Sequence, residues 1–214
     1  MPRTSLLAAA LTVSVCLANA SVASAASSSS AQASHASISA RPALLQGSQT
    51  LVTPKQTAIN KIKTLLTTFF TDQQLSRILD RLAEDIYANK PFKESFNALV
   101  APNDLTASQA MIIMKVESGL QGASGGPLTK ALAVLLRRFE PYYNNISKTI
   151  TAMKKNRRTK ADCLNQVHVM MAGYLTKANV ALVLTDIKSS LTSKEWQSMR
   201  SNGATLFLWG KHGL

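Results

Sequence analysis

Apolar side chains recur at every third or fourth position over most of the chain from residue 53 onward, which is the spacing of amphipathic α-helices. Two segments each place their apolar residues on one helical face: Ile59, Ile62, Leu66 and Phe69, then Leu75, Ile78, Leu79, Leu82 and Ile86. No segment alternates apolar and polar residues over the length of a strand. The pattern therefore predicts one all-α domain of about seven or eight helices over residues 53–214.

Several residue types mark where these helices begin and end. A threonine followed three residues later by Gln or Glu forms a capping box at four places: Thr53, Thr71, Thr106 and Thr192. Pro127 opens a further helix, which we expect to end before Pro141 because proline lacks the N–H of the helix ladder. Residues 160–191 carry two successive apolar stripes, with a bend or break expected at Gly173 or within residues 176–179.

The first 25 residues differ from the rest of the chain and have the layout of a secretory signal peptide. Arg3 precedes an apolar run that reaches Leu17, and the small residues Ala23-Ser24-Ala25 end it as an A-x-A cleavage site. Residues 26–52 are rich in Ser and Ala, which indicates a disordered spacer or pro-segment. We therefore expect a secreted, extracellular protein without a transmembrane span, whose folded domain begins at residue 53.

Secretion changes the meaning of two other positions. Cys163 is left as the only cysteine, because Cys16 is removed with the signal peptide. An intramolecular disulfide is then excluded, and Cys163 offers the only route to a disulfide-linked dimer of what we otherwise expect to be a monomer. The same compartment makes Asn145-Ile146-Ser147 a candidate N-glycosylation sequence, with Asn145 as the acceptor.

The net charge of +13 is unevenly distributed along the chain. Residues 54–120 hold eight Lys and Arg against seven Asp and Glu, whereas residues 121–214 hold fourteen against four. This asymmetry indicates a basic C-terminal half that contacts an acidic macromolecule or an anionic lipid surface, or that is simply well solvated. In the balanced half, ion pairs are expected within one predicted helix, where acidic and basic residues alternate: Arg77, Asp80, Arg81, Glu84 and Asp85.

The densest basic stretch joins two predicted helices and contains Lys154, Lys155, Arg157, Arg158 and Lys160. Such a run could bind phosphate or sulfate groups by charge, or act as a nuclear address after entry into another cell. It could also be cleaved as a dibasic site during secretion, or be a plain solvated connector. No aromatic residue lies between its charges, which disfavours single-stranded nucleic acid bound by base stacking.

Residues with catalytic potential form no complete site in the sequence. Gly122-Ala123-Ser124-Gly125-Gly126 matches the G-x-S-x-G pattern of Ser hydrolases, and Asp162 and His168 follow in the order of that triad. The pattern requires a strand before the serine, and none is predicted. His168 lies on an apolar stripe, where we expect a buried core histidine, and the histidines lack metal-ligand spacing. We therefore expect no catalytic residue, no metal and no cofactor.

Methionines on several helix faces suggest a second kind of site. They are Met111, Met114, Met153, Met170 and Met171. Flexible thioether side chains adapt to apolar ligands of variable shape, so these residues could line an internal site for a fatty acid. Ordinary core packing accounts for the same positions.

Two families show similar features. Phe70-Thr71-Asp72-Gln73-Gln74 and Leu191-Thr192-Ser193-Lys194-Glu195 resemble the L-T-x-E/Q helix openings of nematode fatty-acid- and retinol-binding proteins, which implies a helical carrier of apolar ligands. Signal peptide, spacer and helical domain in that order look like the layout of oomycete effectors, with Arg41-Pro42-Ala43-Leu44 as a degenerate R-x-L-R motif. That resemblance implies a virulence protein delivered into a host cell.

Together these features favour a secreted, non-catalytic helical binding protein of the effector type. Its basic C-terminal half would contact an acidic partner, which is a host protein, a lipid headgroup or nucleic acid. A secreted carrier of fatty acid or another apolar ligand is the alternative, and a Ser hydrolase is a distant third.

Overall fold

A computed structural model describes residues 52–120 and 126–214. In these residues the chain forms eight α-helices and two short 3-10 helices, with no strand, so the predicted all-α domain is confirmed. The elements are α2 (Pro54–Leu65), α3 (Asp72–Tyr87), α4 (Phe92–Ala98), η1 (Pro102–Asp104), α5 (Ala107–Leu120), α6 (Pro127–Lys155), α7 (Lys160–Tyr174), α8 (Lys177–Ser189), α9 (Ser193–Gly203) and η2 (Trp209–His212). The predicted signal peptide and the spacer up to residue 51 lie outside the described residues.

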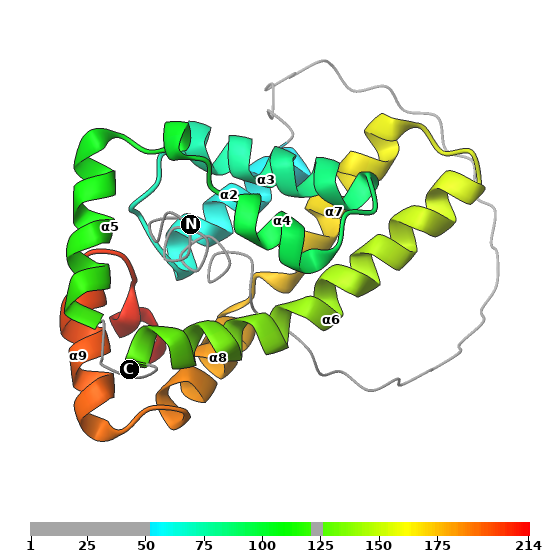
Figure 1. The fold of residues 1–214 in the computed structure, drawn as a ribbon. Coiled ribbons are helices and arrows are strands. Elements are labelled where there is room, and N and C mark those ends of the chain that lie inside the picture. Colours follow the sequence, from blue (N-terminus) through cyan, green and yellow to red (C-terminus); the bar gives the residue numbers. More distant parts are fainter. Residues whose placement is uncertain (1–51, 121–125) are drawn as a thin grey trace, which may run out of the picture.

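The longest helix, α6, has 29 residues and runs through the molecule from one end to the other (Figure 1). At its start Lys130 pairs with Glu195 of α9, and at its end Lys154 donates to the Tyr87 carbonyl of α3. α2 packs against α7, and α5 lies beside α9 at the edge of the molecule. Helices that precede α6 in the chain and helices that follow it therefore both pack against α6.

The core is built from the faces that the periodicity predicts. All five residues of the stripe on α3 are buried: Leu75, Ile78, Leu79, Leu82 and Ile86. Near the middle of α6, Phe139 and Tyr143 contact Phe92 of α4, with ring centroids 5.3 and 5.5 Å from it. Burying one Leu, Ile or Phe side chain stabilises a fold by about 1.5–3 kcal/mol, so these shared faces hold the helices together.

The predicted helix end before Pro141 is wrong, because α6 continues through that proline to Lys155. Proline lacks the N–H that would bond the carbonyl of Arg137, and its ring crowds that carbonyl. Pro141 lies on the exposed side of α6, where the carbonyl can turn toward solvent. α6 bends part of the way along its length (Figure 1), which is the usual response of a helix to an internal proline.

The four predicted threonine caps lie at the starts of α2, α3, α5 and α9. Thr71 and Thr192 form complete capping boxes, and the side chain of Thr53 caps α2. The Thr106 side chain accepts from the N–H of residue 109 at 3.2 Å. A further complete box at Thr159 uses aspartate instead of Gln or Glu, and so falls outside the predicted pattern.

The expected break between residues 160 and 191 is confirmed and lies at residues 175–176. α7 ends at Tyr174, and the side chain of Thr176 caps α8. Among the described residues no single helix is long and apolar enough to cross a membrane. α7 and α8 reach that length only when the two are counted together, across a bend of 70°.

Candidate functional site

The predicted basic run forms the turn between α6 and α7, at the end of the molecule away from α9 (Figure 1). α6 ends there in a left-handed residue, Arg157, with a φ of 55°. The Arg158 N–H donates to the Met153 carbonyl at 3.1 Å and closes the last turn. Glycine is usual at such a position, because a side chain costs about 1–2 kcal/mol in left-handed backbone. The turn therefore carries a charged side chain where glycine would be less strained.

Two of the five basic residues, Lys154 and Lys160, make intramolecular contacts with α3. Lys154 Nζ donates to the Tyr87 carbonyl at 2.9 Å and lies 4.7 Å from the centre of the Tyr87 ring. Lys160 Nζ pairs with Glu84 at 2.8 Å and lies 5.6 Å from the centre of the same ring. These two lysines fasten the adjoining ends of α6 and α7 to the end of α3.

The other three basic residues, Lys155, Arg157 and Arg158, are exposed, and we call them the basic tip. Their side chains make no hydrogen bond or ion pair with any residue that the structure describes. Lys155 lies in the last turn of α6, where the helix dipole favours a cation. The basic tip thus presents three cations to solvent from one short turn.

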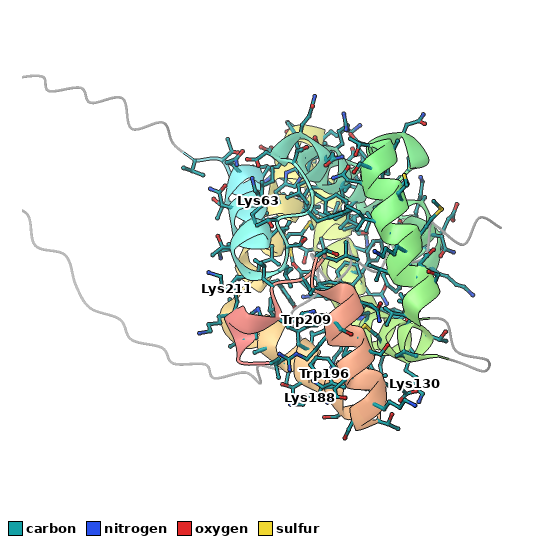
Figure 2. The ribbon with its side chains drawn as sticks, turned by 90° about the vertical axis from the view of Figure 1, so that its left-hand side faces the viewer. Lys63, Lys130, Lys188, Trp196, Trp209 and Lys211 are labelled. Carbon is teal, nitrogen blue, oxygen red and sulfur yellow. The ribbon has the colours of Figure 1, made fainter. Side chains whose placement is uncertain are left out.

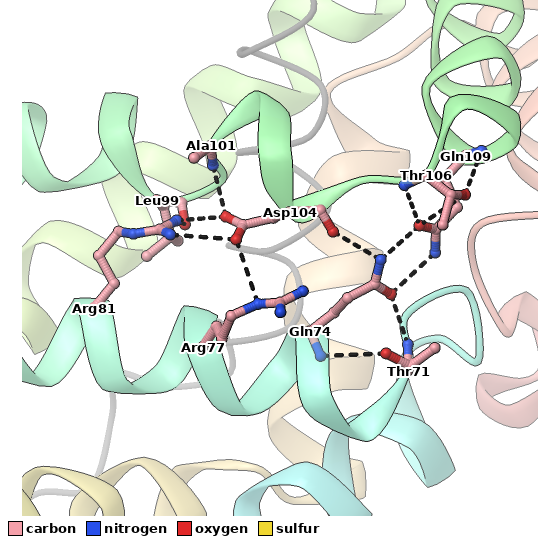
Figure 3. A network of polar contacts seen from close by, with 9 residues as sticks. All are labelled: Thr71, Gln74, Arg77, Arg81, Leu99, Ala101, Asp104, Thr106 and Gln109. Atoms are coloured by element: carbon pink, nitrogen blue, oxygen red, sulfur yellow. Dashed lines mark hydrogen bonds and ion pairs between the residues drawn. The ribbon is translucent and has the colours of Figure 1, made fainter.

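The charges of α3 pair with other elements, and the expected pairs within this helix are wrong. Arg81 and Arg77 reach Asp104 in η1, at 2.6 and 3.6 Å (Figure 3). Asp80 pairs with Lys55 of α2 at 3.0 Å. Because Asp104 is buried, its carboxylate needs cationic partners more than the exposed acids of α3 do.

Asp104 belongs to a polar network that joins α3, η1 and α5 (Figure 3). The Gln74 side chain donates to the Asp104 carbonyl at 2.7 Å and to the Gln109 side-chain oxygen at 2.6 Å. Burial by itself would raise the pKa of Asp104. The bonds from Arg81 and from the Ala101 N–H outweigh burial, so the pKa is lowered. Since these groups find their partners inside the fold, we assign the network a structural role.

The structure does not bring together the residues of the Ser hydrolase pattern. Ser124 lies outside the described residues. Asp162 accepts from the Thr159 N–H in the capping box of α7. His168 is buried, as expected from its apolar stripe, and its Nε2 lies 3.6 Å from Asp80. Burial lowers the pKa of His168, and the Asp80 carboxylate opposes this only in part.

The five methionines do not share an internal site. Met111 and Met114 are 67% and 49% exposed on α5, not in the interior where the sequence placed them. Met171 is buried, and Met153 and Met170 are partly buried against the core. A small apolar cavity of about 30 Å³ between α5, α6, α8 and α9 is lined by none of the five.

Cys163 and Asn145 lie in contrasting environments. Cys163 is fully buried in α7, so it cannot pair with a second chain unless that helix opens. Asn145 is exposed in the middle of α6, where a glycan would project into solvent. Glycosylation of Asn145 stays a prediction, whereas the route to a covalent dimer is closed in the folded state.

No group of three or more His, Cys, Asp or Glu side chains within residues 52–120 and 126–214 is placed to hold a metal ion. The fold and its surface define an all-α protein with an excess of basic side chains. The chain belongs to the family described as "Uncharacterized protein B0228.1-like", which it matches over residues 20–202. No curated protein and no solved structure matches it.

Proposed function

We propose that this chain is a non-catalytic binding protein that contacts an acidic macromolecule through the basic tip. The observation that supports this most directly is a contrast within one basic run. Lys154 and Lys160 bond residues of α3, whereas Lys155, Arg157 and Arg158 are exposed and have no partner among the described residues. Secretion through the predicted signal peptide would take this surface out of the producing cell, to an extracellular partner or to one inside a host cell.

The chemistry of the basic tip suits phosphate, sulfate or carboxylate groups arranged along a polymer. Two of its three cations are guanidinium groups, which bind such groups through two parallel N–H bonds. Each contact with a polyanion releases counterions, so binding should weaken steeply as salt is added. Arg157 keeps its charge at a strained backbone position, which a mere connector would not require.

The test measures the Kd for a heparin oligosaccharide, a soluble polyanion, by calorimetry at a series of salt concentrations. Replacing Lys155, Arg157 and Arg158 with Ala should lower the slope of log Kd against log salt by about two to three. Lys154 and Lys160 are left in place, because their contacts with α3 would be lost with them.

A matched control removes the same charge elsewhere. Lys115, Arg137 and Lys177 are exposed on α5, on the first half of α6 and on α8. Their replacement with Ala should leave the salt slope within about half a unit of the wild-type value. Equal losses in the two triple variants would mean that overall charge, and not the basic tip, drives binding.

A further inference from the structure

We propose that the side of the molecule formed by α5, α9 and η2 docks on a membrane that contains anionic lipids. Methionines of α5 would enter the boundary between headgroups and acyl chains, while cations of α9 and η2 pair with the headgroups. This surface, which we call the α5–α9 face, consists of Met111, Met114, Lys194, Arg200 and Lys211. It shares no residue with the basic tip, so the inference is independent of the proposed function.

The outer side of α5 is an uncharged stripe with apolar side chains at its centre. Its residues are three or four positions apart and all exposed: Ala107, Met111, Met114 and Ser118. Met111 is 67% exposed and Met114 is 49% exposed. Five large apolar side chains are exposed in the part of the chain that the structure describes, and only these two share a helix. Adjacent exposed apolar side chains indicate an interaction surface more than isolated ones do.

Close packing on the other side of α5 keeps these methionines outside. Ile113, Val116 and Leu120 are buried in the core. Gly119 faces α9 so closely that a Cβ on it would lie 2.5 Å from the side-chain oxygen of Asn202. Turning α5 to bury the methionines would break this contact and expose the three core residues. The exposure of the stripe is therefore fixed by the fold.

Three exposed cations lie on the neighbouring elements, and none has a side-chain partner among residues 52–120 and 126–214. Lys194 and Arg200 of α9 border the same open depression as Gly210, which directly precedes Lys211 in η2. α5 in turn contacts α9. Figure 2 looks onto this side of the molecule and shows α5, α9 and η2 next to one another, with Lys211 beside α9.

No acidic side chain neutralises these cations within the same part of the chain. Between residues 177 and 212 the acids are Asp186 and Glu195. Each already has a cationic partner on α6, Arg138 for the first and Lys130 for the second. Lys188, at the end of α8, adds a further exposed cation, whose Nζ lies 5.9 Å from the centre of the Trp196 ring. The unpaired side-chain charge on α8, α9 and η2 is therefore positive.

An anionic bilayer matches both parts of the α5–α9 face. A soluble polyanion would pair with the cations and leave the methionines in water. An acidic protein would have to place acids and an apolar pocket at matching positions on one rigid surface. A bilayer offers negative headgroups and an apolar layer beneath them, and flexible thioether side chains adapt to such a fluid boundary.

The two tryptophans near this surface take no part in it. Trp196 and Trp209 are both only 7% exposed. Trp209 Nε1 has no hydrogen-bond partner among the described residues, but it lies beside Gly203, which lines the enclosed apolar cavity. Docking through α5 and α9 therefore leaves the core unchanged, and it directs the basic tip, at the other end of the molecule, away from the bilayer (Figure 1).

The first test measures binding to vesicles of phosphatidylcholine and phosphatidylserine, mixed at about 3:1. The protein is purified from the medium of secreting cells, so that the predicted signal peptide does not contribute its own membrane affinity. Replacing Met111 and Met114 with Gln should weaken binding at least tenfold, because both lose apolar surface that the bilayer would bury. The matched control replaces Val52 and Val169, which are 61% and 42% exposed on other elements, and should bind within twofold of the wild type.

The second test removes charge. Each Lys or Arg near an anionic bilayer strengthens binding about fivefold, so replacing Lys194, Arg200 and Lys211 with Gln should weaken it about a hundredfold. Vesicles of phosphatidylcholine alone should bind the wild type about as weakly. The triple Ala variant of the basic tip removes equal charge at the far end of α6, which is about 40 Å long. It should bind within threefold of the wild type, since screening acts over about 10 Å.

The third test reports insertion directly. Cys163 is buried, so Met111→Cys offers an accessible thiol for an environment-sensitive fluorophore such as nitrobenzoxadiazole. Its emission should shift to the blue when phosphatidylserine vesicles are added. The same label on Val169→Cys, on α7, should not shift.

The inference is overturned if the label at residue 111 does not shift, or if the methionine variant binds vesicles like the wild type. A loss in the charge variant without a loss in the methionine variant would assign the cations to a soluble acidic partner and contradict membrane docking. Equal losses in the charge variant and the basic-tip variant would mean that overall charge, and not the α5–α9 face, attracts the membrane.

Discussion

At Arg157 the left-handed backbone favours glycine, whereas the proposed binding surface requires a cationic side chain. Its φ of 55° suits glycine, yet the side chain present is one of the three unpaired cations of the basic tip. We expect Arg157→Gly to stabilise the fold by about 1 kcal/mol while weakening binding to heparin oligosaccharide. Arg158→Gly removes the same charge at a residue without positive φ, so it should weaken binding without stabilising the fold. Urea unfolding measures the stability, and calorimetry measures the binding. If Arg157→Gly destabilised the fold, the left-handed backbone of Arg157 would not be a source of strain.

Asp104 is a buried carboxylate held by two arginines. Asp104→Asn would leave Arg81 without its carboxylate partner, and we expect a loss of about 2 kcal/mol in the free energy of unfolding. Glu84→Gln, at an ion pair about half exposed on both sides, should cost less than about 1 kcal/mol. A similar loss for the two substitutions would show that the burial of Asp104 does not increase the contribution of its ion pair to the free energy of unfolding.

The lowered pKa of Asp104 gives this contribution a defined dependence on pH. A carboxylate whose pKa is lower in the fold stabilises it above the unfolded pKa of about 3.9. That stability is lost as the pH falls through the lower, folded value. The difference between wild type and Asp104→Asn should therefore be full at neutral pH and shrink below about pH 4.

His168 predicts a second pH dependence, at milder acidity. Burial lowers its pKa, so the unfolded chain takes up a proton near pH 6.5 before the folded chain does. The free energy of unfolding should consequently fall as the pH drops below about 6.5. His168→Gln should lose less stability than the wild type between pH 7.5 and 5.5 in denaturant unfolding. Equal losses would mean that this histidine is protonated in the fold as easily as in the unfolded chain.

At the scale of elements, α6 tests how a proline is tolerated inside a helix. Pro141 is exposed, so Pro141→Ala adds a helix bond without disturbing the core. An interior proline costs about 3 kcal/mol relative to alanine, offset by the freedom that it removes from the unfolded chain. We expect Pro141→Ala to stabilise the protein by about 1–2 kcal/mol in urea unfolding. Destabilisation would instead mean that packing on both halves of α6 requires the bend.

The sequence pattern predicts the helices of this fold better than it predicts which residues their side chains contact. Caps and stripes are local properties, and accordingly the start of α3 at Thr71 and its buried face are as expected. Pairing partners are not local, and Arg77 and Arg81 bond Asp104 from another element. α5 is apolar around most of its circumference, so spacing alone could not tell that Met111 and Met114 face outward.

The same limit applies to the candidate sites. The basic run is visible in the sequence, but only the structure separates Lys154 and Lys160 from the three cations of the basic tip. Residues 207–210 lie against α9, and the sequence offers no periodic signal for that contact. An N–H without a partner, as in Trp209, can be recognised only once all its neighbours are placed.

At the scale of the whole molecule, cations outnumber acidic side chains by 24 to 11. At least seven of the acids already form ion pairs with Lys or Arg in the described residues. One of them, Glu195, has its pKa lowered to about 2, chiefly by its bond with Lys130. The surplus cations therefore repel one another without local compensation.

Added salt should screen this repulsion and stabilise the protein. Raising NaCl from 10 to 150 mM is expected to add about 1 kcal/mol, which is about 2–4 °C in melting temperature for a chain of this size. Differential scanning fluorimetry measures the shift, with sucrose as a neutral control. A fall in melting temperature would mean that the ion pairs outweigh the repulsion.

The central position of α6 has a consequence for how the protein comes apart. Its contacts with α3 and α4 on one side and with α8 and α9 on the other mean that neither group keeps its core when the other melts. Heat should therefore unfold the described domain in one cooperative transition, with equal calorimetric and van't Hoff enthalpies. A ligand bound at either end of the molecule would then raise the stability of both ends together.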